Sequence, residues 1–238
     1  MGDRERLDGS NVHVWGARLD PSLAELRAFA STLSADEMER ARRFHFERDQ
    51  SSFIAARGVL RAILGAHLQV DPGRIEFSYG PQGKPALMGA DADLTFNLSH
   101  SDDVAFVALT RGRTIGVDIE RMKPFAEVAD VTRTIFSARE LAEFWALPPD
   151  DQQGSFFSAW TRKEAFVKAT GLGFSMSVKE VEVSFAQGEE AQLVRLNGSA
   201  GLAKQWTLRD LAAPDGFKAA FAVPGPVLRV VREEWTTR

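Results

Sequence analysis

The sequence predicts an α+β protein built from two similar halves. Hydrophobic residues recur with helical spacing up to about residue 70 and then with the two-residue spacing of strands up to about residue 119. The same order, helices followed by strands, returns between about residues 126 and 231. We therefore expect a division near Gly112–Gly116, which gives an N-terminal half of residues 1–113 and a C-terminal half of residues 114–238.

In the first half, a short strand precedes three helices. The helices are expected to begin at an Asp20-Pro21 cap, at a capping box of Ser34 and Glu37, and around Phe53. The strands are short, rich in β-branched or aromatic residues and separated by turn residues. They are expected at Val12–Gly16, Ile75–Tyr79, Leu94–Leu98, Val104–Leu109 and Thr114–Ile119, the last four as a meander.

The second half repeats this order. The expected helices are Ala126–Ile135, Ala138–Trp145 with a capping box of Ser137 and Glu140, and Phe156–Thr170, which Gly171 stops. The expected strands are Val181–Phe185, Gln205–Leu211, Phe217–Val223 and Val227–Val231.

Composition and charge exclude several classes of function. The 238 residues include no cysteine, which rules out disulfides, thiolate nucleophiles and Cys-ligated zinc. The net charge of -4 argues against a general nucleic-acid binder, and no apolar run is long enough to suggest a signal peptide or a membrane span. We expect a cytoplasmic protein that binds neither nucleic acid nor membrane. Between Glu39 and Arg61, however, six arginines face three acidic residues, a pattern that suits a confined anionic ligand or a solvated helix face.

Two loop segments combine glycine or serine with a cationic or ionisable side chain. Gly83-Lys84-Pro85 allows close backbone approach beside a point charge, although a surface turn would have the same composition. In Asn97-Leu98-Ser99-His100-Ser101, the hydroxyls and the imidazole could donate hydrogen bonds to a phosphate. A histidine satisfied within a turn is the alternative for this second segment.

Two further segments carry carboxylates. On a strand, Asp118 and Glu120 would share one face, where two like charges favour a hard metal cation or else mark an exposed strand end. On a helix, Trp160, Glu164 and Lys168 would form one row with Lys163 beside it. We expect this row to be partly buried, the alternative being a surface ladder of ion pairs.

Taken in order, these four segments resemble the signatures of the Sfp-type 4′-phosphopantetheinyl transferases. The resemblance covers roughly residues 34 to 175 and rests on Gly83-Lys84-Pro85, Asn97-x-Ser99-His100-Ser101, Gly116-x-Asp118-x-Glu120 and Trp160-x-x-Lys163-Glu164-Ala165-x-x-Lys168. It implies two α+β halves related by a pseudo-twofold, with coenzyme A in the cleft between them. It also implies a monomer, since both halves of the cleft come from one chain.

The resemblance implies a set of site residues. Asp118, Glu120 and Glu164 are expected to hold Mg²⁺, with Mn²⁺ as an alternative ion, and Glu164, Lys168 and Lys163 are expected to be catalytic. Coenzyme A is expected to contact a larger set, namely Arg40, Arg57, Lys84, Pro85, Ser99, His100, Asp118, Lys163 and Lys168.

The implied reaction transfers phosphopantetheine from coenzyme A to a serine of an acyl, peptidyl or aryl carrier protein. The carrier is expected to dock on the Lys163 helix and on residues 122–135. Two alternatives remain open on the residues alone: a magnesium-dependent phosphohydrolase, and a non-catalytic module that binds coenzyme A or a carrier.

Overall fold

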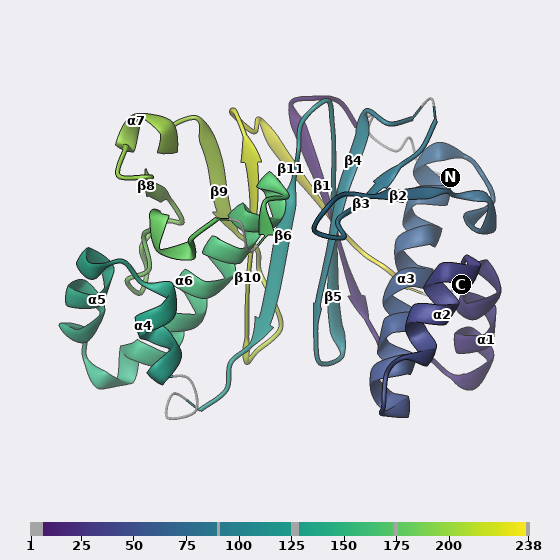
Figure 1. Cartoon of the computed structure of the whole chain (residues 1–238), viewed down its shortest axis with the longest axis horizontal. Helices are drawn as coiled ribbons and strands as arrows, with labels where there is room; N and C mark the ends of the chain where they lie inside the picture. Colours follow the sequence, from purple (N-terminus) through teal and green to yellow (C-terminus); the bar gives the residue numbers. More distant parts are fainter. Residues whose placement is uncertain (1–6, 90, 125–128, 174–175, 237–238) are drawn as a thin grey trace.

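The chain folds into four layers, with helices outside two central sheets (Figure 1). The structure is a computed structural model, which describes residues 7–89, 91–124, 129–173 and 176–236. In Figure 1, α1, α2 and α3 cover the sheet of the N-terminal half, and α4, α5 and α6 cover the sheet of the C-terminal half. The predicted α+β fold with two similar halves is confirmed.

In its described residues, the N-terminal half contains one strand, three α-helices, a short 3₁₀ helix and then four strands. Its helices are α1 (Leu23–Thr32), α2 (Ala35–Arg42), α3 (Glu47–Leu68) and the short 3₁₀ helix η1 (Pro72–Arg74). Its strands are β1 (Asn11–Arg18), β2 (Phe77–Tyr79), β3 (Pro85–Leu87), β4 (Leu94–Ser101) and β5 (Val104–Arg111).

The C-terminal half has the same order. Its helices are η3 (Ala129–Val131), α4 (Thr132–Ile135), α5 (Ala138–Trp145), α6 (Pro149–Thr170), η5 (Val178–Glu180) and α7 (Ala200–Ala203). Its strands are β6 (Gly116–Arg121), β7 (Val181–Val183), β8 (Leu193–Leu196), β9 (Trp206–Asp210), β10 (Phe217–Pro224) and β11 (Arg229–Glu234).

The strand order shows that the halves are equivalent. The first sheet has the order β11-β1-β5-β4 and the second β6-β10-β9, so β1, β5 and β4 correspond to β6, β10 and β9. Each half also carries a separate two-stranded hairpin, β2–β3 or β7–β8. The strand β11 breaks the correspondence, because it comes from the C-terminal half of the sequence but pairs in parallel with β1. The proposed division at residue 113 stays a prediction.

Three apolar clusters hold the layers together. One face of the first sheet packs on α3, around Leu60 and Ile63, and one face of the second sheet packs on α5 and α6, around Phe144 and Phe166. The remaining faces meet in a third cluster that includes Phe106 and residues of β6 and β10. Burial of apolar area at about 25 cal/mol per Å² makes this the main force that joins the two halves.

Several local expectations need correction. The cap of α1 is Ser22, whose side chain forms a capping box with Glu25, and not Asp20-Pro21. The strands β3 and β8 and the helix α7 were not predicted. The expected meander of four strands is also wrong, because β2 lies in its own hairpin and β6 lies in the second sheet. The start of the helix expected at Ala126–Ile135 lies outside the described residues, and η3 and α4 cover its remainder.

Candidate active site

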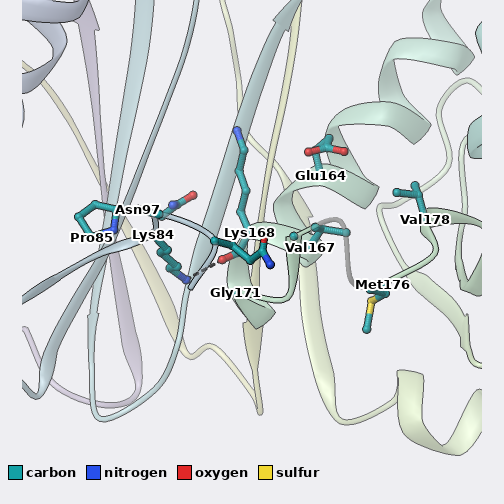
Figure 2. Close-up of a pocket in the computed structure, with 12 residues that line it drawn as sticks. Lys84, Pro85, Asn97, Glu164, Val167, Lys168, Gly171, Met176 and Val178 are labelled. Carbon is teal, nitrogen blue, oxygen red and sulfur yellow. Dashed lines mark hydrogen bonds between the residues drawn. The ribbon is translucent and has the colours of Figure 1, made fainter. Parts of the chain in front are cut away.

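A pocket of about 350 Å³, here called the central pocket, is lined by both halves (Figure 2). The N-terminal half contributes Lys84 of the loop before β3, Pro85 at the start of β3, and Asn97 of β4. The C-terminal half contributes Glu164 and Lys168 of α6 and the segment that follows this helix. The pocket therefore brings together three of the four segments that the sequence singled out.

The fourth segment, β6, supplies two carboxylates beside the pocket. Val117 and Ile119 point into the apolar cluster between the sheets, and Asp118 alternates with them, as the strand period predicted. Only 1% of Asp118 is exposed. Its position in β6 is opposite Ala220 of β10, which belongs to the core beneath α6, so Asp118 faces α6.

The helix α6 lies directly on β6. A Cβ atom on Gly116 would lie 2.0 Å from the carbonyl oxygen of Ala165, so only glycine allows this approach. Lys168, one turn after Glu164, donates from Nζ to Asp118 Oδ1 at 2.5 Å. The predicted helical row therefore places a cation and a carboxylate against the β6 carboxylates.

The carboxylates influence one another. Burial raises the pKa of Asp118 to about 7; the Lys168 ammonium works against this shift, while the charges of Glu120 and Glu164 add to it. Burial also raises the pKa of Glu164, which Lys168 opposes and Glu120 increases. Three carboxyl groups that affect one another in this way need a positive partner to be ionised together.

The donor set is compatible with a divalent cation. Asp118 Oδ2 is buried and has no hydrogen-bond partner, and carboxylate oxygen is the ligand that Mg²⁺ prefers. Within the described residues, no three Asp, Glu or His side chains lie close enough to form a ready-made metal centre. Lys168 instead neutralises Asp118 from one side, which leaves its second oxygen free.

Lys84 is oriented differently from the expectation. Its Nζ donates to three backbone carbonyls of the other half, those of Ile115 at 3.0 Å, Ala169 at 3.3 Å and Lys168 at 2.6 Å, the last of which is drawn in Figure 2. An ammonium group has three protons, so all of its donors are used. Lys84 therefore ties the N-terminal half to the last turn of α6 instead of presenting a free charge to the pocket.

This burial predicts a pH effect on stability. Burial lowers the pKa of Lys84 from 10.5 to about 8, so between these values the unfolded chain binds more protons than the folded one. The free energy of unfolding of the wild type, relative to Lys84→Met, should therefore rise from pH 8 to pH 10.5 and stay level below pH 8. Urea denaturation of both proteins across this range measures the difference. A relative stability that falls with pH would show that the three carbonyls outweigh burial and raise the pKa.

The polar side chains of β4 are held in place. Ser99 is buried; its Oγ donates to Asp118 Oδ1 at 3.0 Å and accepts from Lys168 Nζ at 2.9 Å. His100 lies on the opposite face of the strand with its side chain exposed. Although solvent reaches this side chain, desolvation by the protein around it and then the charge of Lys168 lower the pKa of His100, so the neutral imidazole, with one N–H donor, is favoured.

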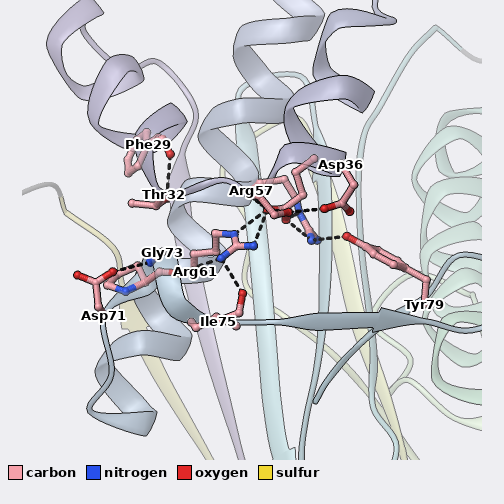
Figure 3. Close-up of polar contacts among 12 residues, drawn as sticks. Phe29, Thr32, Asp36, Arg57, Arg61, Asp71, Gly73, Ile75 and Tyr79 are labelled. Atoms are coloured by element: carbon pink, nitrogen blue, oxygen red, sulfur yellow. Dashed lines mark hydrogen bonds and ion pairs between the residues drawn. The ribbon is translucent and has the colours of Figure 1, made fainter. Parts of the chain in front are cut away.

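A second cavity, of about 580 Å³ and here called the arginine cavity, adjoins the central pocket through Gly83, which lines both. Arg40 and Arg57 line it, as expected for an anion site. Arg57, however, pairs with the buried Glu37 and donates to Tyr79 Oη (Figure 3). Among its lining residues, three arginines face three acidic residues, so the cavity has no formal excess of positive charge.

Glu37 also binds a second arginine, which belongs to the predicted arginine-rich segment but was not assigned to the site. Arg61 Nε donates to Glu37 Oε2 at 2.7 Å, and its Nη1 donates to the carbonyls of Pro72 and Ile75 (Figure 3). Arg61 is 1% exposed and Glu37 2% exposed. Two buried guanidinium groups thus share one carboxylate. Arg40 forms no ion pair with any described residue and lies over the ring of Phe53.

The expectation that Lys163 lies at the catalytic site needs correction. The sequence placed it beside the catalytic row, but its side chain is fully buried on the other side of α6. Its Nζ donates to Glu140 Oε2 at 2.7 Å and to the carbonyls of Val178 and Val181. Lys163 therefore joins α5, α6 and β7 and does not reach the central pocket. The capping box of Glu140 was predicted, but its role as the buried counter-ion was missed.

Comparisons with known proteins agree on one family. A model described as "4'-phosphopantetheinyl transferase superfamily" matches residues 114–222, and one described as "4'-phosphopantetheinyl transferase, N-terminal" matches residues 17–111. The chain is 39% identical over 221 residues to 4'-phosphopantetheinyl transferase HetI of Nostoc sp., which covers 92% of this chain and 90% of that protein. It is 29% identical over 184 residues to 4'-phosphopantetheinyl transferase Sfp of Bacillus subtilis, with 76% and 80% covered.

A solved ACPS–CoA complex from Chronobacterium ammoniagenes matches at 20% identity with a TM-score of 0.36, over 47% of this chain and 95% of that chain. The family models and the sequence matches define a transferase. The chain belongs to the 4′-phosphopantetheinyl transferase superfamily, as its motifs predicted. Among the described residues, none of the helices combines the length and apolar composition needed to span a bilayer.

Proposed function

We propose that this enzyme transfers the 4′-phosphopantetheine arm of coenzyme A to a serine of an acyl, peptidyl or aryl carrier protein, with Mg²⁺ or Mn²⁺ as the metal. The observation that supports this most is the group formed by Asp118, Glu164 and Lys168 at a pocket lined by both halves. A diphosphate needs cations on several sides, and this group offers an ammonium and the oxygens for a divalent ion.

In this proposal Asp118, Glu120 and Glu164 hold the metal. The bound ion would supply Lewis-acid polarisation of the diphosphate. Lys168 Nζ lies 2.5 Å from Asp118 Oδ1, so a phosphate bound beside Asp118 would also be close to the Lys168 ammonium. Arg40, Arg57 and His100 are the proposed contacts for the nucleotide phosphates. Lys84 contributes by holding the last turn of α6, and hence Lys168, in position.

The proposed chemistry is a phosphoryl transfer without a covalent enzyme intermediate. The serine oxygen of the carrier attacks the β-phosphorus of coenzyme A, and the bond from this phosphorus to the bridging oxygen breaks. The carrier gains a phosphodiester and 3′,5′-adenosine bisphosphate leaves. Glu164 accepts the serine proton directly or through a water molecule. Positioning and electrostatics supply most of the rate in such transfers.

The carrier would dock beside the central pocket. The expected docking segment includes residues 125–128, which lie outside the described residues. Of its described part, Met122 packs against the core of the C-terminal half. Lys123 and Pro124 precede the undescribed residues, and Lys123 is a cation suited to an acidic carrier. A monomer stays our expectation.

Incubation with an apo carrier protein, coenzyme A and Mg²⁺, followed by intact-mass measurement of the carrier, tests the function. Transfer adds the mass of one phosphopantetheine arm, and omission of Mg²⁺ prevents it. Release of products from coenzyme A with no change in the carrier would replace the proposal with a phosphohydrolase. Binding of coenzyme A without any product would replace it with a binding module.

Glu164→Gln should lose turnover and keep its affinity for coenzyme A. Removal of a general base typically costs about 10²- to 10⁴-fold in rate, so we expect a fall in that range and a dissociation constant for coenzyme A within about 3-fold of wild type. Single-turnover kinetics and calorimetry measure the two quantities. The control is Asp151→Asn, near the other end of α6, away from the central pocket. An unchanged rate for Glu164→Gln would remove this residue from the chemistry.

A further inference from the structure

Strand β4 has an unusual polar face. Asn97, Ser99 and Ser101 alternate along it and point toward the second sheet. Their partners across the β4–β5 ladder are Ala108, Phe106 and Val104, which lie in the apolar cluster between the two sheets. Polar side chains on such a face need hydrogen-bond partners, because burial of unpaired polar groups costs free energy.

Strand β6 supplies these partners. Among the described strands it pairs only with β10, which makes it an edge strand of the second sheet. An edge leaves every second backbone N–H without a strand partner, which is costly where water is excluded. Val117 N donates to Asn97 Oδ1 at 2.8 Å, Ile119 N to Ser99 Oγ at 3.4 Å, and Arg121 N to Ser101 Oγ at 3.1 Å. The side chains of β4 therefore replace the missing strand along β6.

The two serines also reach the carboxylates. Ser99 Oγ donates to Asp118 Oδ1 at 3.0 Å, and Ser101 Oγ donates to Glu120 Oε2 at 3.1 Å. A hydroxyl has a single proton, so one that accepts from a backbone N–H can direct this proton at the neighbouring carboxylate. Both serines repeat one geometry, accepting from residue i of β6 and donating to the side chain of residue i−1.

The third position supports this reading. By the same geometry, Asn97 accepts from Val117 N, and the preceding residue is Gly116, which has no side chain. Serine thus occurs at the two positions that face a carboxylate, and asparagine at the one that does not.

We propose that Ser99 and Ser101 are positioning residues. The edge N–H groups of β6 fix their hydroxyls, and the hydroxyls in turn orient Asp118 and Glu120 for a divalent cation. This inference rests on the proposed metal role of these carboxylates. It replaces the expectation that Ser99 contacts coenzyme A. Ser101 gives the sharper test, because Ser99 also accepts from Lys168 and its loss would disturb the ammonium group.

Mn²⁺ affinity of the full-length protein, measured by electron paramagnetic resonance without coenzyme A or carrier, tests the inference apart from activity. Loss of a group that orients a metal ligand typically weakens metal binding by about 10- to 100-fold, and we expect Ser101→Ala to fall in this range. Ser101→Thr keeps the hydroxyl and should stay within about 3-fold of wild type by the same comparison.

Asn97→Ala is the matched control. It removes the same kind of bond to a β6 amide but touches no carboxylate. It should lower the urea midpoint about as much as Ser101→Ala and leave Mn²⁺ affinity within about 3-fold of wild type, since it orients no ligand.

Three outcomes would each overturn a stated role. A wild-type protein that binds no Mn²⁺ would overturn the proposed metal site and this inference with it. If the wild type binds Mn²⁺ but Ser101→Ala binds it equally well, the positioning role alone is wrong. The same holds if Asn97→Ala weakens Mn²⁺ binding as much as Ser101→Ala, because the serines would then act only through the stability of the strand contact.

Discussion

Asp118→Asn should abolish metal-dependent transfer without unfolding the protein. Loss of one preorganised electrostatic contact typically costs about 10²- to 10³-fold in turnover. Asp118 combines an oxygen proposed for the metal with the ion pair to Lys168, so we expect a loss of about 10³-fold or more. Initial rates across a Mg²⁺ titration measure the effect.

The stability of the Asp118→Asn protein should not fall together with its activity. Burial disfavours the charged form of Asp118, as its pKa of about 7 indicates, so a neutral amide there removes a buried charge. We expect the free energy of unfolding at pH 8 to be unchanged or higher, within about 1 kcal/mol of wild type. The control is Asp102→Asn in the exposed β4–β5 turn, where asparagine tolerates the positive φ of 49°. Full activity of Asp118→Asn would refute its role in the site.

Glu37→Gln should produce the largest loss of stability. Removal of one partner from a buried ion pair typically costs about 3–5 kcal/mol, and here the loss leaves two buried guanidinium groups without a counter-charge. Glutamine keeps the size of the side chain and can still accept from Ser34 N in the capping box, but its NH₂ group then faces the Arg57 donors in place of an acceptor oxygen. Urea denaturation at pH 7 measures the effect.

Glu39→Gln on the same helix is the matched control. Glu39 pairs with Arg43 at the surface, where both side chains are mostly exposed, and such pairs contribute about 0–1 kcal/mol. A loss for Glu37→Gln no greater than that for Glu39→Gln would show that Arg57 and Arg61 are stable without the carboxylate. In that case Arg57, which lines the arginine cavity, would be available to an anionic ligand there.

Local signals predicted much of the fold. The bounds of α5 were predicted correctly, because a capping box marks its start and its apolar residues repeat at helical spacing. The stop of α6 at Gly171 was also predicted, since this glycine takes the left-handed conformation that ends helices. Alternation along β6 correctly placed Val117 and Ile119 in the core and Asp118 on the other face.

Features that depend on tertiary partners could not be predicted in this way. Helical spacing sets Lys163 beside Glu164, but only the packing of α5 and β7 shows that Glu140 takes up its charge. The spacing of Gly83-Lys84-Pro85 says nothing of the three carbonyls that bind Lys84, because they belong to the other half. Strand partners are likewise set by the whole fold, which is why the meander was wrong.

The pairing of β11 with β1 has a consequence for how the protein forms during translation. Asn11 pairs with Arg229, 218 residues further along the chain (229 − 11), so β1 must wait for a segment that the ribosome makes much later. Until then the backbone N–H and C=O groups on the outer edge of β1 are unpaired and can pair with a strand of another chain. Contacts this distant in sequence also form slowly. The polypeptide is therefore most prone to aggregate while its N-terminal portion is made and β11 is not. Synthesis of residues 229–234 removes this risk, because β11 then covers the free edge of β1.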